Sequence, residues 1–137
     1  MALIHLDAGV LIGFLDGTNA RHAVARAAIA GAVDGADRLV MAASAFAECL
    51  VGPARQGDRA VEVVLALRQR LPIEIVVLDV DTATTAARLR ARHRPLRLPD
   101  ALVIATAARH AADALVTTDR RWPTAKALGL SAELRII

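Results

Sequence analysis

Hydrophobic residues along the chain follow two patterns: short, mainly apolar runs alternate with longer segments in which apolar positions recur every three or four residues. The short runs predict strands, which are Leu3–Leu6, Leu39–Met41, Ile73–Leu78, Ala114–Val116 and Leu134–Ile137. The periodic segments predict helices. These are Ala8–Leu15, Thr18 or Asn19 to about Ile29, Ser44 onward with interruptions at Gly52-Pro53 and Gly57, Asp58 to about Arg70, Asp81 or Thr82 to about Arg92, and Leu98 to about Ala111.

This alternation of strands and helices indicates the fold class. Strands that alternate with helices form parallel βαβ units, and right-handed crossovers place the helices on both faces of the sheet. We therefore predict an α/β fold with three layers, α/β/α, around a central, mainly parallel sheet. A chain of 137 residues has the length of one ordinary domain, and neither a repeat nor a linker divides it. The prediction is a single domain over residues 1–137.

Composition narrows the class of protein. No apolar run approaches the roughly 18–20 residues that cross a bilayer. The beginning of the chain has the pattern of a first strand and lacks the charged region and cleavage site of a signal peptide. Cys49 is the only cysteine, so an intrachain disulfide is excluded, and no zinc-ligand spacing is present. We expect a cytoplasmic protein without membrane contact.

The formal net charge is +3 and the sequence pI is about 10.4, and Lys126 is the only lysine. The excess positive charge is therefore carried by arginine, whose guanidinium grips phosphate oxygens with two parallel hydrogen bonds. This balance favours a polyanionic partner. A genome rich in G and C also favours arginine over lysine, and it explains the choice of arginine better than it explains where the arginines lie.

Four acidic residues stand where an α/β fold places its site. Asp7 directly follows the first predicted strand, and Asp119 follows the fourth after two threonines. In open α/β sheets, ligands bind beyond the carboxyl ends of the strands, so both acids should lie on that rim. Asp100 falls in the first turn of a helix, where the helix dipole favours an anion. Glu48 lies off the apolar stripe of its helix and faces a groove or solvent.

Four carboxylates in one crevice would repel each other unless a cation compensated their charge. Mg²⁺ and Mn²⁺ prefer oxygen ligands, and such a cation can activate water for phosphodiester hydrolysis. The chain lacks GxxxxGK[ST] and GxGxxG, which argues against a P-loop or Rossmann nucleotide site. Each acid also has an ordinary structural explanation, as a cap, a first-turn residue, a turn residue or a solvated side chain. Spacing alone leaves both explanations open.

The segments around these acids add a resemblance. They are Ile4–Ile12, Ser44–Pro53, Leu98–Ala107 and Leu115–Trp122. Together, in this order and over essentially the whole chain, they resemble the PIN-domain family, and more narrowly the VapC ribonuclease toxins of prokaryotic toxin–antitoxin pairs. The resemblance implies that Asp7, Glu48, Asp100 and Asp119 are the catalytic, metal-binding acids. It also implies that Thr117 supplies a hydroxyl beside the metal site.

The same resemblance implies further properties of the protein. The expected cofactor is Mg²⁺, with Mn²⁺ possible, and the expected activity is endoribonuclease. The expected partners are RNA, a cognate VapB-like antitoxin and a second copy of the chain in a homodimer. Ala8 departs from the family, which often has Ser or Thr after the first acid, so one potential hydroxyl is absent but no metal ligand is lost.

Arginines crowd the approach to two of the acids. We predict RNA or antitoxin contact for Arg88, Arg92, Arg94, Arg97, Arg120 and Arg121, because phosphate contacts dominate nucleic-acid affinity. The alternative is a set of solvated helix and turn positions. Helical geometry places Arg88 and Arg92 on a different face from Arg90 and Arg94, so these arginines cannot all share one role.

Other polar and aromatic residues have ordinary interpretations. Trp122 is interpreted as a packing anchor rather than a base-stacking platform, and His5, His22 and His110 as packing or surface residues. Two functions compete with the ribonuclease. One is a catalytically silent PIN scaffold that binds RNA or protein, and the other is a metal-dependent DNA nuclease.

Overall fold

The computed structural model describes all 137 residues and contains one five-stranded sheet in the order β3-β2-β1-β4-β5. Every neighbouring pair of strands is parallel. The strands are β1 (Leu3–Leu6), β2 (Arg38–Ala42), β3 (Ile73–Val76), β4 (Ala114–Thr117) and β5 (Glu133–Ile136). The predicted α/β class with a parallel central sheet is confirmed.

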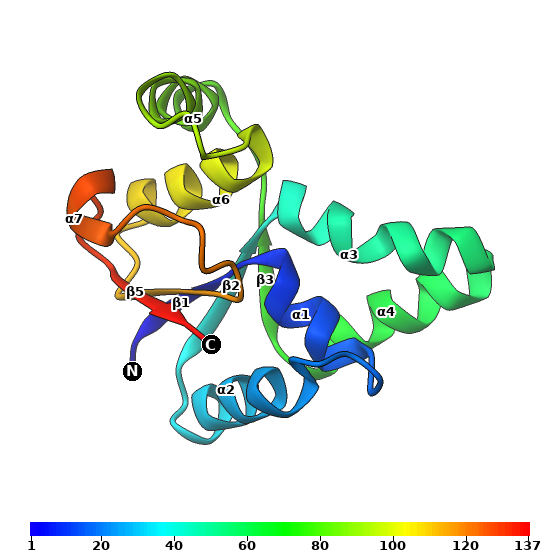
Figure 1. The fold of residues 1–137 in the computed structure, drawn as a ribbon. Coiled ribbons are helices and arrows are strands. Elements are labelled where there is room, and N and C mark those ends of the chain that lie inside the picture. The colour runs from blue at the N-terminus through cyan, green and yellow to red at the C-terminus, as the bar shows by residue number, and fades with distance from the viewer.

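Seven helices surround the sheet (Figure 1). They are α1 (Ala8–Leu15), α2 (His22–Asp34), α3 (Ala43–Gln56), α4 (Asp58–Arg70), α5 (Val80–Arg92), α6 (Leu98–Arg109) and α7 (Ala125–Leu128). Figure 1 shows α1 and α2 on one side of the sheet and α5, α6 and α7 on the other, with the α3–α4 pair extending sideways from the body. Three layers therefore form, as predicted.

The strand order reverses at β1, and this reversal positions the site. The connections from β1 through β2 to β3 run toward one edge of the sheet, whereas β4 and β5 lie on the other side of β1. Right-handed crossovers consequently place the later helices on the opposite face from the earlier ones. The carboxyl ends of β1 and β4 are neighbours here, since Leu6 pairs with Val116. Such a switch point is where open α/β sheets bind ligands.

The core is built from small and branched residues. Thirty-two buried hydrophobic residues form one cluster. In α6, Ala101, Ala105 and Ala107 are fully buried, which lets this helix pack closely on the sheet. Trp122 is buried, in agreement with its interpretation as a packing anchor. None of the helices is long and apolar enough to cross a membrane.

Several predicted helix boundaries were wrong for identifiable reasons. Helix α2 begins at His22, after the predicted caps, and reaches Asp34 rather than Ile29. The polar residues before it instead close two turns: the Asp16 carboxylate accepts from Thr18, and the Asn19 side chain accepts from the Arg21 N–H. A run of turn-forming residues thus delays the helix, because each side chain caps a local turn.

Helix α3 also differs from its prediction. It begins at Ala43 directly after β2, without a cap from Ser44, and it continues through Gly52 and Pro53 to Gln56. Pro53 lies in the last turn, where its missing N–H costs one backbone hydrogen bond near the end of the helix. The helix ends at Gly57, whose positive φ of 126° favours glycine. Only this second interruption was correctly predicted.

The remaining differences lie at element ends. Strand β3 stops at Val76 rather than Leu78, and α5 begins at Val80 because the Asp79 carboxylate accepts the Thr82 N–H at 2.7 Å. Helix α6 ends at Arg109, before Ala111, which has a positive φ of 51°. Helix α7 was not predicted, since four residues are too few to show a period.

Candidate active site

Asp7 lies at the switch point and is held through both carboxylate oxygens. It is the N-cap of α1, and its Oδ1 accepts the Ala8 N–H at 2.8 Å. Its Oδ2 accepts the Thr117 hydroxyl at 2.8 Å. The backbone N–H of Asp7 donates to the carbonyl of Val116, which ties the end of β1 to β4. The side chain is therefore fixed in a single orientation at the carboxyl edge of the sheet.

Thr117 connects the acids of the two strands. It is completely buried at the end of β4. Its Oγ1 donates to Asp7 and accepts the backbone N–H of Asp119 at 3.0 Å. One hydroxyl thus orients one acid and positions the backbone of a second.

Asp100 and Glu48 approach the same place from two other helices. Asp100 lies in the first turn of α6, where its carboxylate is buried, and its Oδ2 is 3.6 Å from Nε of Arg97. Glu48 lies on α3 and is exposed. Partial burial raises the pKa of Glu48, the charge of Asp100 raises it further, and the charge of Arg97 opposes both.

Three of the acids, Asp7, Asp100 and Glu48, lie close enough for their charges to interact. Burial raises the pKa of Asp7 to about 6, against the hydrogen bonds from Thr117 and Ala8. The negative charges of Asp100 and Glu48 raise it further. The charged form of Asp7 is therefore disfavoured, mainly because the side chain is buried and to a lesser extent because two other acids are near.

Asp119 is engaged differently. Arg121 donates from Nε to Oδ1 at 3.1 Å and from Nη2 to Oδ2 at 3.0 Å. The backbone N–H of Arg121 also donates to Oδ1, at 2.9 Å. These contacts lower the pKa of Asp119, and the charge of Arg97 lowers it further. Asp119 therefore follows β4 as predicted, but its oxygens bind an arginine of the same turn.

The donor set fits a hard divalent cation that keeps part of its water shell. All four candidate side chains offer carboxylate oxygens, which Mg²⁺ and Mn²⁺ prefer. No three His, Cys, Asp or Glu side chains lie close enough to form a ready-made cage. Mg²⁺ needs only one or two protein carboxylates beside its waters, so a closed cage is not required. The observation that supports the fit is the buried carboxylate of Asp7 at the switch point, near the charges of Asp100 and Glu48, because a bound cation would offset both its burial and the repulsion from the other acids.

The six predicted arginines divide into three pairs by their place in the fold. Arg97 and Arg121 lie at the acids, as their ion pairs with Asp100 and Asp119 show. Arg88 and Arg92 lie on α5, exposed, and Arg92 Nε donates to the Arg88 carbonyl at 3.4 Å. They make no contact with the acids.

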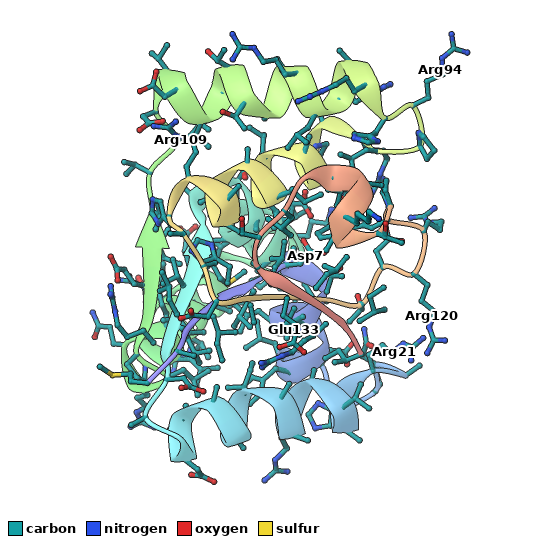
Figure 2. All side chains as sticks on the ribbon, turned by 90° about the vertical axis from the view of Figure 1, so that its left-hand side faces the viewer. Asp7, Arg21, Arg94, Arg109, Arg120 and Glu133 are labelled. Carbon is teal, nitrogen blue, oxygen red and sulfur yellow. The ribbon has the colours of Figure 1, made fainter.

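Figure 2 shows Arg94 and Arg120 on one side of the molecule, together with Arg21. Arg94 and Arg120 are exposed. Arg21, between α1 and α2, was not among the predicted contacts, because a single arginine in a polar turn carries no pattern. This side therefore presents three positive charges from three separate loops.

An apolar groove opens beside Glu48. It has a volume of about 630 Å³ and lies between α1, α3 and α4. Its apolar lining includes Ile12, Leu15, Pro53, Val63, Val64 and Leu67. Cys49 lies on its wall with the Sγ 3.6 Å from the Ala8 carbonyl, and burial raises the pKa of this thiol to about 12. The cysteine is thus a packing residue rather than a nucleophile.

Residues 4–128 match the family model described as the PIN domain. The chain belongs to the PIN-domain family. No curated protein is significantly similar to this PIN domain in sequence. Solved structures share its fold, among them VapBC-1 from nontypeable Haemophilus influenzae, with a TM-score of 0.71 and 17% identity over 98% of this chain and 97% of that chain.

Two further structures resemble this PIN domain. A toxin–antitoxin complex from Klebsiella pneumoniae has a TM-score of 0.66 and 24% identity, covering 85% of this chain and 86% of that one. Mycobacterium tuberculosis VapC20, described as a sarcin–ricin loop cleaving toxin, has a TM-score of 0.66 and 17% identity, covering 82% of this chain and 86% of its own. At these identities the likeness concerns the fold.

Proposed function

We propose that this PIN domain is a divalent-metal-dependent endoribonuclease that uses Mg²⁺ or Mn²⁺. The observation that carries the proposal is the position of Asp7. It lies at the switch point of the sheet, fixed by Ala8 and Thr117, and burial raises its pKa, with a further contribution from the charges of Asp100 and Glu48. Such an arrangement concentrates negative charge at the place where the fold binds ligands.

In this proposal the four acids have different roles. Asp7, Asp100 and Asp119 hold the principal cation, and Glu48 completes the shell or accepts the proton of the attacking water. When bound, a divalent cation would polarise the phosphodiester and stabilise charge on the leaving oxygen. Thr117 keeps Asp7 in place and positions the backbone of Asp119. Glu48 suits a proton-accepting role because it is exposed and its pKa is raised.

RNA is the proposed substrate. Arginines lie on three loops of one side of the molecule, with Arg94 and Arg120 exposed and Arg21 partly buried, and a similar structure, VapC20, is described as a toxin that cleaves the sarcin–ricin loop. Backbone phosphates would bind these arginines and direct a strand toward the acids. RNA as substrate also agrees with the proposed cytoplasmic location.

A small antitoxin is the proposed protein partner. Similar structures include toxin–antitoxin complexes. The groove between α1, α3 and α4 is apolar and opens beside Glu48, so an amphipathic antitoxin helix bound there would lie next to the acids. The resemblance to VapC toxins extends the proposal to a homodimer.

The test is cleavage of total cellular RNA by the antitoxin-free protein, with Mg²⁺, with Mn²⁺ and with EDTA. We expect discrete fragments that require the metal and that are absent with Asp100→Asn, a nearly isosteric change. Matched RNA and DNA strands, incubated side by side, distinguish the ribonuclease from a DNA nuclease. Folded wild-type protein that binds metal but cleaves neither strand would instead support the silent scaffold.

A further inference from the structure

Asp119 and Arg121 form the closest charged contact among the four acids. Both carboxylate oxygens accept from the guanidinium, at 3.1 and 3.0 Å, and Oδ1 also accepts the backbone N–H of Arg121. Asp100, by comparison, has a single arginine nitrogen 3.6 Å from one oxygen. Two-point pairing of this kind is the stronger geometry.

This contact conflicts with metal binding by Asp119. The guanidinium and the Arg121 N–H together use three of the four lone-pair sites of the carboxylate, so one site on Oδ2 is left for a cation. A cation at that site would lie beside the guanidinium, and the two positive groups would repel each other. Binding of a cation by Asp119 is therefore favoured when Arg121 releases at least one oxygen.

The structure shows which partner is free to move. The Asp119 side chain is only 17% exposed, and its backbone N–H is held by the buried hydroxyl of Thr117. The Arg121 side chain is 77% exposed, so it can rotate toward solvent without disturbing the core. Arg121 is consequently the partner that moves.

We propose that the guanidinium of Arg121 neutralises Asp119 while no cation is bound, and that it moves from this carboxylate to an RNA phosphate when a divalent metal binds. The inference rests on the proposed function. A released guanidinium remains at the rim of the site, and it can form the same two-point contact with a phosphate. Metal binding and RNA binding then strengthen each other through Arg121, by the reciprocity of linked equilibria.

Arg120 provides a matched control. It precedes Arg121, is exposed, and makes no ion pair in the structure. Arg120→Gln and Arg121→Gln each remove one positive charge from the same turn, so general electrostatic effects on a nearby cation are similar. The difference between the two variants isolates the contact with Asp119.

The first measurement is the affinity of the full chain for Mn²⁺ by titration calorimetry. We expect Arg121→Gln to bind Mn²⁺ about three- to tenfold more tightly than Arg120→Gln, because no guanidinium has to leave Asp119. Equal or weaker binding by Arg121→Gln would overturn the inference. Both variants should unfold in one cooperative transition like the wild type, because both side chains are exposed, and loss of the ion pair with Asp119 should lower the stability of Arg121→Gln only slightly.

The second measurement is the affinity for a short single-stranded RNA, by fluorescence anisotropy, in EDTA and in Ca²⁺, which binds oxygen ligands and is used here to slow cleavage. Arg121→Gln should lose about three- to tenfold in RNA affinity with Ca²⁺ and little in EDTA, where the guanidinium is occupied by Asp119. Arg120→Gln should lose a similar factor under both conditions. An equal loss for Arg121→Gln under both conditions contradicts the proposed movement.

These outcomes separate the two proposals. If the wild-type protein cleaves RNA with metal while the two variants bind Mn²⁺ alike, only the role of Arg121 is overturned. If neither the wild type nor any variant binds Mn²⁺, the proposed metal site fails, and the role of Arg121 fails with it.

Discussion

The Thr117 hydroxyl donates to Asp7 Oδ2 at 2.8 Å, and this one hydrogen bond joins the ends of the two central strands at the candidate site. The two residues are 110 positions apart in the sequence. Asp7 would otherwise have only the Ala8 N–H to hold it. Orientation of the first acid therefore depends on a residue of the fourth strand.

Thr117→Val should reduce RNA cleavage. The substitution preserves the shape of the side chain but removes the hydroxyl that orients Asp7 and accepts from the Asp119 N–H. We expect a loss of about 10- to 100-fold in kcat/KM, the range for residues that orient a metal ligand. Thr117→Ser keeps the hydroxyl and should retain most of the activity. A larger loss in Thr117→Ser than in Thr117→Val would show that the methyl group matters and the hydroxyl does not.

Asp7→Asn should stabilise the protein in EDTA at neutral pH. Burial and the neighbouring acids raise the pKa of Asp7 to about 6, so the folded state disfavours its charged form. The resulting destabilisation is absent when the pH is below the ordinary pKa of an aspartate. It grows as the pH rises from there to about 6, and it is fully present above that pH. At pH 8 we expect the variant to unfold with a free energy about 2 kcal/mol higher than the wild type.

Urea denaturation at several pH values tests this expectation. The advantage of Asp7→Asn should shrink as the pH falls below 6 and should be lost near pH 4. A variant that is less stable than the wild type at pH 8 would show that the charged form of Asp7 is favoured in the folded protein.

Asp79→Ala should lower the melting temperature, because its carboxylate caps α5 through the Thr82 N–H. The hydrogen bond lowers the pKa of Asp79, so this stabilisation is present above the ordinary pKa and is lost as the pH falls through the lowered folded value. Asp79→Asn still accepts the hydrogen bond and should behave more like the wild type. Calorimetric scans at pH 7 and in strong acid compare the three proteins.

Two helical glycines should respond oppositely to alanine. A Cβ at Gly9 would collide with the Thr118 hydroxyl, beside Asp119, so Thr118 would have to rotate, whereas a Cβ at Gly31 meets open space. Gly31→Ala should raise the free energy of unfolding by about 0.5–1 kcal/mol, the helix-propensity gain. In Gly9→Ala the collision outweighs the helix-propensity gain, so this variant should have a free energy of unfolding about 1 kcal/mol lower than the wild type. Chemical denaturation of both variants measures the contrast.

The sequence predicted the parts of the site that depend on local pattern. Strand β1 is a short, mainly apolar run followed by a charged residue, so the position of Asp7 at the sheet edge followed from residue type. Asp100 was predictable because Pro99 marks a first helical turn. The alternation of strands and helices likewise indicated the parallel sheet.

Other features depend on three-dimensional packing and left no local pattern. Whether α3 passes Pro53 depends on how its last turn packs against α4, and the sequence favoured an interruption. The pairing of Arg121 with Asp119 rather than with solvent is a choice between side-chain conformations. Arg21 joins the basic side only because a loop brings it there.

The exchange of strand order at β1 has a consequence for synthesis of the chain on the ribosome. The sheet neighbours of β1 are β2, which begins at Arg38, and β4, which is made much later and begins at Ala114. A nascent chain that ends before β4 lacks both Thr117 and Asp119, so Asp7 has no partner across the strands. Under the proposed function, an unfinished chain could not cleave nearby RNA, because the four acids can assemble only after residue 119 has emerged.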